Sequence, residues 1–234
     1  MTDFVLLHGA WHGGWCWGRV AEILRARGHR VTTPTQTGLG ERAHLLSPDI
    51  TLTTFCEDLR LHIEFEGHSD AVLVGHSFGG SPISYAAERA ADRVARLVYL
   101  DAIMVYPGET PFSHMAPDVV ALRRQLAADS SGGLSLPPPP AAAMGVTDKS
   151  DAAWLERMMT PHPLATFETP LDIAAVPGGT KPASYVMCTD PIYSPLETSR
   201  ARAHDLGMTM AEIAAGHDAM VTAPAALADI LEAG

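Results

Sequence analysis

A serine between two glycines is the first sign of chemistry in this chain. The run Gly75-His76-Ser77-Phe78-Gly79 follows an apolar segment, 71–74, that is typical of a buried strand, and it precedes a segment, 81–91, that is typical of a helix. A serine on such a sharp strand-to-helix turn presents its hydroxyl outward, and the crowded turn favours glycine on either side. An ordinary glycine turn would share the five residues but would not need this context. The pattern predicts that Ser77 is a catalytic nucleophile.

A serine hydroxyl is a weak nucleophile, so it needs a general base and a group that orients the base. In this strand-turn-helix arrangement the acid and the histidine follow the serine along the chain. His217 comes after a strand-like run, 208–213, and before a helical run, 224–231, as a catalytic loop would. We therefore predict His217 as the base. His204 falls inside a predicted helix, 196–205, and is interpreted as a solvated surface histidine.

A glycine-rich turn near the start of the chain could stabilise the oxyanion that serine attack produces. The buried strand 4–7 runs directly into the segment 8–15, which contains three glycines. The backbone N–H groups of Ala10 and of Phe78, the residue after the nucleophile, are predicted to form the oxyanion hole. His8 and His12 have the i, i+4 spacing of a metal pair, but the segment is not helical and no Glu follows His8. We expect them to brace the turn by hydrogen bonds.

Composition narrows the class of protein. The chain has 234 residues, is 47% hydrophobic and 18% charged, and carries a formal net charge of −11, which fits one ordinary globular domain. The acidic balance argues against nucleic acid and against an anionic membrane surface as partners. Cys16, Cys56 and Cys188 are scattered, which predicts neither a disulfide framework nor a zinc site. The start of the chain has no targeting pattern and no apolar run approaches roughly 20 residues, so we expect a cytoplasmic protein.

Strand-like and helix-like segments alternate along most of the chain. This alternation predicts an α/β fold with a mostly parallel sheet of about six strands and helices on both faces. Ligands bind at the carboxyl ends of the strands in such sheets. The expected strands are 4–7, 30–33, 71–74, 96–100, 183–188 and 208–213, and the expected helices are 17–27, 53–65, 81–91, 196–205 and 224–231.

The alternation stops between residues 102 and 181, where prolines, glycines and methionines accumulate. A segment this long without strand signals inside an α/β domain is interpreted as a functional insertion. We predict a core of residues 1–101 and 182–234 and a helical cap, 102–181, with helices at 117–128 and 151–158. Its apolar side chains could line an adaptable site. The candidates are Met104, Phe112, Met115, Met158, Met159 and Phe167.

Taken together, the strand and turn through His8-Gly9-Ala10, the elbow at Ser77 and the late Gly216-His217 resemble the α/β-hydrolase superfamily. They are most similar to its branch of plant methylesterases, hydroxynitrile lyases and bacterial carboxylesterases, including pyrethroid hydrolases. The resemblance implies the α/β-hydrolase fold, with Ser77 as nucleophile, His217 as base, and Ala10 and Phe78 as oxyanion-hole donors.

The triad acid departs from the family pattern. Family members place an Asp after the strand equivalent to 183–188, four residues before a proline that opens the next helix. Counting back from Pro195, that position is Pro191, and Asp190 stands one residue earlier. We predict Asp190 as the acid on the basis of this resemblance. Asp101, at the end of the predicted strand 96–100, is the alternative.

The resemblance implies a serine carboxylesterase acting through an acyl-enzyme on neutral, bulky apolar esters, with pyrethroid-like esters as one class. The small-molecule substrate is the only partner implied, no metal or organic cofactor is needed, and a homo-oligomer is compatible with the sequence. Charged substrates are expected to be poor because no cationic partner is evident near the site. A cyanohydrin lyase is one alternative, but such relatives carry Thr in place of Gly9 and Lys in place of Asp218. A non-catalytic small-ligand receptor on the same fold is the other.

Overall fold

A six-stranded sheet forms the centre of the computed structural model, which describes residues 1–179 and 181–234. Its strand order is β2-β1-β3-β4-β7-β8, and every neighbouring pair is parallel. The strands are β1 (Asp3–Leu7), β2 (Arg30–Thr32), β3 (Ala71–His76), β4 (Val94–Leu100), β7 (Ala183–Cys188) and β8 (Thr209–Ile213). All six lie where the sequence predicted strands, with small differences at their ends.

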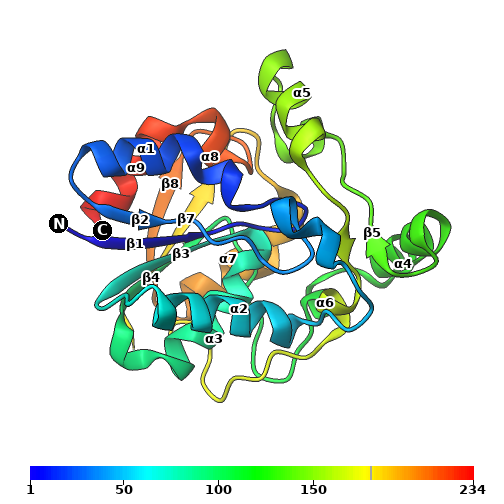
Figure 1. The fold of residues 1–234 in the computed structure, drawn as a ribbon, viewed down its shortest axis with the longest axis horizontal. Helices are drawn as coiled ribbons and strands as arrows, with labels where there is room; N and C mark the ends of the chain where they lie inside the picture. Colours follow the sequence, from blue (N-terminus) through cyan, green and yellow to red (C-terminus); the bar gives the residue numbers. More distant parts are fainter. Residues whose placement is uncertain (180) are drawn as a thin grey trace.

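Helices cover both faces of this sheet (Figure 1). Leu6 and the alternate apolar strand residues pack against α1 (Gly18–Ala26), α8 (Ala219–Thr222) and α9 (Pro224–Ala233). Val5 and Leu7 face the other way and pack with α2 (Leu52–Phe65), α3 (Gly80–Arg89) and α7 (Glu197–Asp205). Because both faces are buried, the strands are continuous apolar runs rather than alternating ones. The predicted α/β fold is confirmed.

Short 3-10 helices connect or extend these elements. They are η1 (Gly14–Trp17), η2 (Gly40–Leu45), η3 (Ser77–Gly79), η4 (Ala91–Arg93), η5 (Pro111–His114), η6 (Ala141–Met144) and η7 (Ser194–Leu196). Two of them, η1 and η7, end on the first residue of the predicted helices 17–27 and 196–205, so a tighter turn leads into each of these helices.

The segment 102–181, which we call the insertion, contributes no strand to the six-stranded sheet in its described residues. It holds α4 (Pro117–Ser131), α5 (Lys149–Met158) and α6 (Ala165–Glu168), and the two-residue strands β5 (Ser135–Leu136) and β6 (His162–Pro163) pair antiparallel. Both predicted helices are present, and α4 and α5 project beyond the sheet in Figure 1. The exact limits 102 and 181 stay a prediction, and Thr180 lies outside the described residues.

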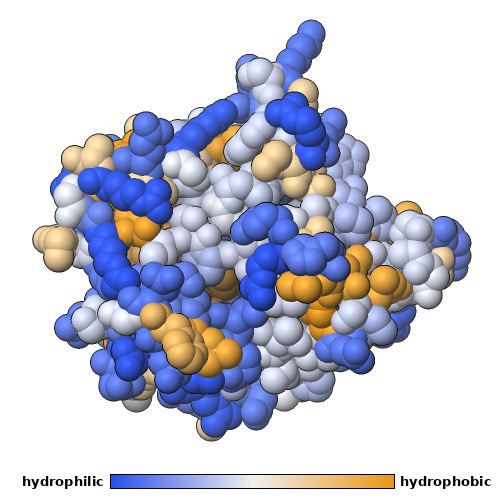
Figure 2. All heavy atoms as spheres, in the orientation of Figure 1, coloured by the Kyte–Doolittle hydropathy of each residue, from blue (hydrophilic) through white to orange (hydrophobic). Residues whose placement is uncertain are grey.

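Polar and charged side chains cover most of the face seen in Figure 2, with separate apolar patches between them. Three apolar side chains of α4, Val119, Leu122 and Leu126, are exposed. Among the described residues, no helix has both the length and the apolar character needed to cross a bilayer.

Candidate active site

The turn between β3 and α3 has the geometry of a nucleophile elbow. Ser77 follows the last residue of β3 and has a φ of +52°, a left-handed backbone that a side chain rarely adopts. A Cβ at Gly75 would lie 2.6 Å from the carbonyl oxygen of Gly79, and one at Gly79 would lie 3.0 Å from the carbonyl oxygen of His8. The glycines are therefore required by close backbone contacts, as the sequence predicted.

A chain of hydrogen bonds joins Ser77 to His217 and to a buried carboxylate. The hydroxyl of Ser77 donates to Nε2 of His217 at 2.9 Å, and Nδ1 of His217 donates to Oδ2 of Asp101 at 2.7 Å. Asp101 is 0% exposed and His217 4%. Because a carboxylate only accepts, it holds the imidazole in the tautomer that leaves Nε2 free to take the serine proton. The structure thus joins serine, histidine and acid in one chain of hydrogen bonds.

The acid in this chain of hydrogen bonds is Asp101, so the prediction of Asp190 is wrong. Asp190 lies in the exposed turn after β7, where its backbone N–H bonds to Ala215, and its carboxylate makes no hydrogen bond to His217. Asp101 follows β4, the strand that pairs directly with the serine strand β3. Its other oxygen accepts from Arg200 at 3.0 Å. An Asp directly after an apolar strand was the sequence signal for this position.

Two further side chains contact His217. Tyr193 stacks on its ring with centroids 4.2 Å apart and planes 21° apart. Nε2 of His76 donates to the backbone carbonyl oxygen of His217 at 3.0 Å. Burial keeps the pKa of His76 well below its usual range, which matches a neutral donor. The sequence analysis did not single out either residue.

The glycine-rich turn after β1 is braced as predicted. His8 donates from Nδ1 to the carbonyl oxygen of Gly9 at 2.8 Å and accepts from the N–H of Gln36 at 3.1 Å, and burial lowers its pKa to about 3. His12 donates from Nδ1 to the carbonyl oxygen of Ala10 at 2.7 Å. Among the described residues, no group of three or more His, Cys, Asp or Glu could hold a metal ion.

A buried ion pair ties this turn to the histidine loop. Nε2 of His12 donates to Oδ2 of Asp218 at 3.2 Å, and both side chains are almost fully buried. Burial disfavours both charges, but each stabilises the other: the pKa of Asp218 falls to about 2 and that of His12 rises above its usual range. Asp218, next to His217, is therefore paired with His12 and not with the catalytic-loop histidine.

A small cavity opens over Ser77. It has a volume of about 30 Å³ and its walls come from the elbow, the glycine-rich turn, the insertion and η7. It is lined by Ala10, Trp11, Ser77, Phe78, Ile103, His114, Met115, Arg123, Phe167, Tyr193, Pro195 and Leu196. The predicted oxyanion-hole residues Ala10 and Phe78 both reach it, beside the nucleophile.

Two sequence expectations about this cavity need correction. Of the six apolar residues proposed to line it, Met115 and Phe167 do so, whereas Phe112 and Met158 are not among the lining residues. Met104 and Met159 belong to the cores under the sheet helices. No cationic partner was expected near the site, yet Arg123 is part of the wall. The sequence could not show this, because the direction of one side chain on α4 depends on how the helix lies.

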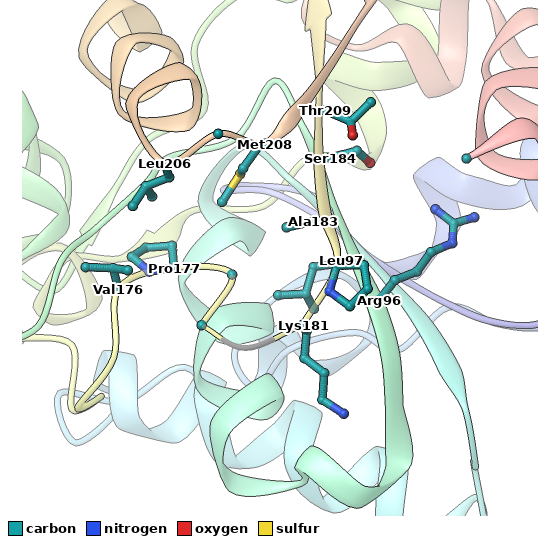
Figure 3. A pocket seen from close by; sticks show the side chains of 15 residues that line it. Arg96, Leu97, Val176, Pro177, Lys181, Ala183, Ser184, Leu206, Met208 and Thr209 are labelled. Carbon is teal, nitrogen blue, oxygen red and sulfur yellow. The ribbon is translucent and has the colours of Figure 1, made fainter.

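A larger cavity, about 470 Å³, lies elsewhere (Figure 3). Its walls include Leu97, Ala183 and Thr209, which stand near the amino ends of β4, β7 and β8. Ligands in open α/β sheets bind at the opposite, carboxyl edge, where Ser77, Asp101 and His217 meet. Size alone therefore does not make this cavity the active site.

Comparison with known proteins agrees with an α/β-hydrolase fold and with a hydrolytic enzyme. Residues 4–230 match the model of the family described as "Alpha/beta hydrolase family". A carbendazim hydrolyzing esterase of Nocardioides sp. is 40% identical to this chain, in an alignment that covers 100% of this chain and 99% of the esterase. A pyrethroid hydrolase of Sphingobium wenxiniae is 38% identical over 50% of this chain and 41% of its own.

Among solved structures, an extracellular alpha/beta-hydrolase from a Paenibacillus species superposes with a TM-score of 0.85. It is 26% identical, covering 100% of this chain and 99% of that one. The chain belongs to the alpha/beta hydrolase family. With relatives named as esterases and hydrolases, it is a carboxylic ester hydrolase, and the resemblance read from the sequence is confirmed.

Proposed function

We propose that the protein is a serine carboxylesterase that hydrolyses neutral, bulky apolar esters through an acyl-enzyme. The observation that carries this proposal is the unbroken hydrogen-bond chain from Asp101 through His217 to Ser77, which ends in a cavity. In this proposal Ser77 is the nucleophile, His217 the general base and Asp101 the orienting acid. Ala10 and Phe78 supply the oxyanion-hole N–H groups.

The reaction follows from this geometry. Nε2 of His217 takes the proton of Ser77 as Oγ attacks the ester carbonyl, and the oxyanion forms beside the N–H groups of Ala10 and Phe78. The protonated His217 then gives its proton to the leaving alcohol, and the acyl group stays on Oγ. A water attacks this acyl-enzyme, its proton goes to His217 and then to Ser77, and the acid leaves. Asp101 stays ionised throughout and stabilises the imidazolium.

The walls of the cavity support apolar substrates. Trp11, Phe78 and Phe167 present aromatic rings, and Ile103 and Leu196 add aliphatic surface. The cavity is small, about 30 Å³, and its apolar walls favour apolar groups over charged ones beside Ser77. Carbendazim and pyrethroid esters, named for two relatives, are the first compounds to try.

Two features of the site weigh against a cyanohydrin lyase. Asp218, where such relatives carry Lys, is occupied by its pair with His12. A Cβ at Gly9, where they carry Thr, would lie 2.7 Å from the Cβ of Ser77. A receptor without catalysis would not need the aligned serine, histidine and acid. The net charge of −11 supports our further proposal that the enzyme acts on small molecules, without nucleic-acid or anionic-membrane partners. The free cysteines Cys16, Cys56 and Cys188 support the proposal that it acts in the cytoplasm.

The test is hydrolysis of a panel of neutral esters of rising size by the wild type and by Ser77→Ala. We expect kcat/KM to rise with apolar bulk, since each buried methylene contributes roughly 0.8 kcal/mol, and we expect Ser77→Ala to lose roughly 10⁴-fold or more in kcat. Ser130→Ala, at an exposed position of α4, is the matched control and should keep full activity. Hydrolysis that survives in Ser77→Ala at the wild-type rate would exclude this mechanism.

A further inference from the structure

The wall of the catalytic cavity contains a guanidinium for which the proposed hydrolysis has no use. Arg123, in the middle of α4, lines the same cavity as Ser77, Ala10 and Phe78. Its Cζ lies 5.4 Å from the ring centroid of Phe167 and 5.8 Å from that of Trp11. The side chain is thus directed inward from the insertion, between two aromatic walls of the site.

The neighbouring Arg124 differs from Arg123 in the direction of its side chain. Arg124 points outward, has a 58% exposed side chain and forms an ion pair with Glu168 at 2.7 Å. Arg123, by contrast, has no carboxylate within ion-pairing distance in the part of the chain that the structure describes, and the polar side chain beside it is the hydroxyl of Tyr193. Burial lowers the pKa of Arg123 accordingly.

A partly buried cation without an anionic partner is unfavourable unless something stabilises it. Aromatic faces compensate in part through cation–π attraction. The planar guanidinium has several N–H donors, and Arg123 lines the cavity that a substrate must enter. Donors placed in an apolar site discriminate strongly between ligands with and without an acceptor, because an unmatched polar group stays desolvated.

We propose that Arg123 is a specificity-determining residue that binds a hydrogen-bond acceptor, a carbonyl or carboxylate oxygen, on the substrate at a distance from the scissile ester. This inference rests on the proposed esterase function and refines its substrate class. The preferred substrates are apolar esters that carry a second acceptor group. Tyr193 stacks on His217 and neighbours Arg123, so the acceptor is bound on the histidine side of the cavity.

Three esters of similar length separate acceptor recognition from apolar bulk: methyl heptanoate, dimethyl adipate and monomethyl adipate. The measurement is the ratio of kcat/KM for dimethyl adipate to kcat/KM for methyl heptanoate. We expect Arg123→Met to lower this ratio by roughly ten-fold to a hundred-fold, which corresponds to a hydrogen bond with a charged donor. Arg123→Lys should keep part of it, and Arg124→Met should leave it unchanged. For monomethyl adipate, the ratio of kcat/KM to that for methyl heptanoate should fall at least as much in Arg123→Met.

Methyl heptanoate reports whether each variant is folded and active, because it offers no second acceptor. An unchanged ratio in Arg123→Met would overturn the proposal while leaving the esterase function intact. Should the wild type hydrolyse no neutral ester of the earlier panel and none of these three, the proposed function fails, and acceptor binding is then measured by calorimetry. In that case dimethyl adipate should bind Ser77→Ala protein at least ten-fold more tightly than it binds the Ser77→Ala, Arg123→Met double variant, and equal affinities would contradict the inference.

Discussion

At the scale of single residues, the position of one carboxylate decides how the site works. Asp101 is fully buried, accepts from both His217 and Arg200, and so holds a fixed orientation. Asp190 is exposed and makes no contact of this kind. A buried acceptor beside Nδ1 sets the tautomer that catalysis requires, whereas a solvated one in a turn cannot.

Replacing these two carboxylates by amides separates their roles. Asp101→Asn should lower kcat by roughly 10⁴-fold, because Asn can donate to Nδ1 and stabilise the wrong tautomer. Asp190→Asn should stay within about two-fold of the wild type, as expected of exposed substitutions. Steady-state kinetics on one neutral ester, with thermal melting to check folding, makes the comparison. A larger loss in Asp190→Asn would return the acid role to that residue.

The buried pair of His12 and Asp218 predicts a pH dependence of stability. The pKa of Asp218 lies at about 2 in the fold and near 3.8 when the chain is unfolded. Ionised Asp218 therefore adds roughly 2 kcal/mol to the free energy of unfolding above about pH 4, and this contribution is lost as the pH falls toward 2. The raised pKa of His12 acts in the other direction. Protonated His12 stabilises the fold below about pH 6.5, and this stabilisation is lost as the pH rises through the pKa that His12 has in the fold.

Urea unfolding between pH 2.5 and 6 tests the acidic limb. The difference in free energy of unfolding between wild type and Asp218→Asn should shrink as the pH falls, from a loss of roughly 3–5 kcal/mol for breaking a buried pair. Asp205→Asn, which changes an exposed carboxylate, is the control and should follow the wild type. Parallel curves for wild type and Asp218→Asn would show that the pair is not ionised in the fold.

At the scale of elements, the residues of the proposed catalytic triad come from the ends of separate strands. Ser77 follows β3, Asp101 follows β4, and His217 stands in the loop after β8. The insertion also contacts this edge: the N–H of Ile103 bonds to the carbonyl oxygen of Ser77 at 3.0 Å. Gly145 of the insertion packs on Gly216, backbone to backbone, so we expect the position of the His217 loop to depend on the insertion.

Two glycines of the insertion test this dependence. Gly145, with φ +78°, would place a Cβ 2.8 Å from the Cα of Gly216, whereas Gly133, with φ +91°, has nothing within 4 Å of its Cβ position. Alanine at either site strains the backbone by roughly 1–3 kcal/mol. Only Gly145→Ala should displace the His217 loop, and we expect it to lower kcat by roughly ten-fold or more.

The two variants are compared by thermal melting and by kcat on the same ester. Similar melting temperatures with a loss of kcat confined to Gly145→Ala would agree with a mechanical link between insertion and loop. Full activity in Gly145→Ala would show that the loop holds its position without that contact.

At the scale of the whole molecule, the sequence predicted what depends on local pattern. Apolar runs located all six strands of the sheet, and the glycine spacing located the elbow at Ser77 and the loop at His217. Asp101 could not be chosen over Asp190 in this way, because the choice depends on β4 lying between β3 and β7. Arg123 and Arg124 are neighbours of the same type, and only the docking of α4 shows which one reaches the cavity.

The proposed mechanism requires Ser77 to be a nucleophile activated by His217 and Asp101. The decisive measurement is to treat the protein with a fluorophosphonate probe and to identify the modified peptide by mass spectrometry. We predict a single modification on Ser77, none in Ser77→Ala, and much slower labelling in His217→Ala and Asp101→Asn. Labelling of another residue, or labelling of Ser77 at the same rate in all three proteins that retain it, would contradict the account.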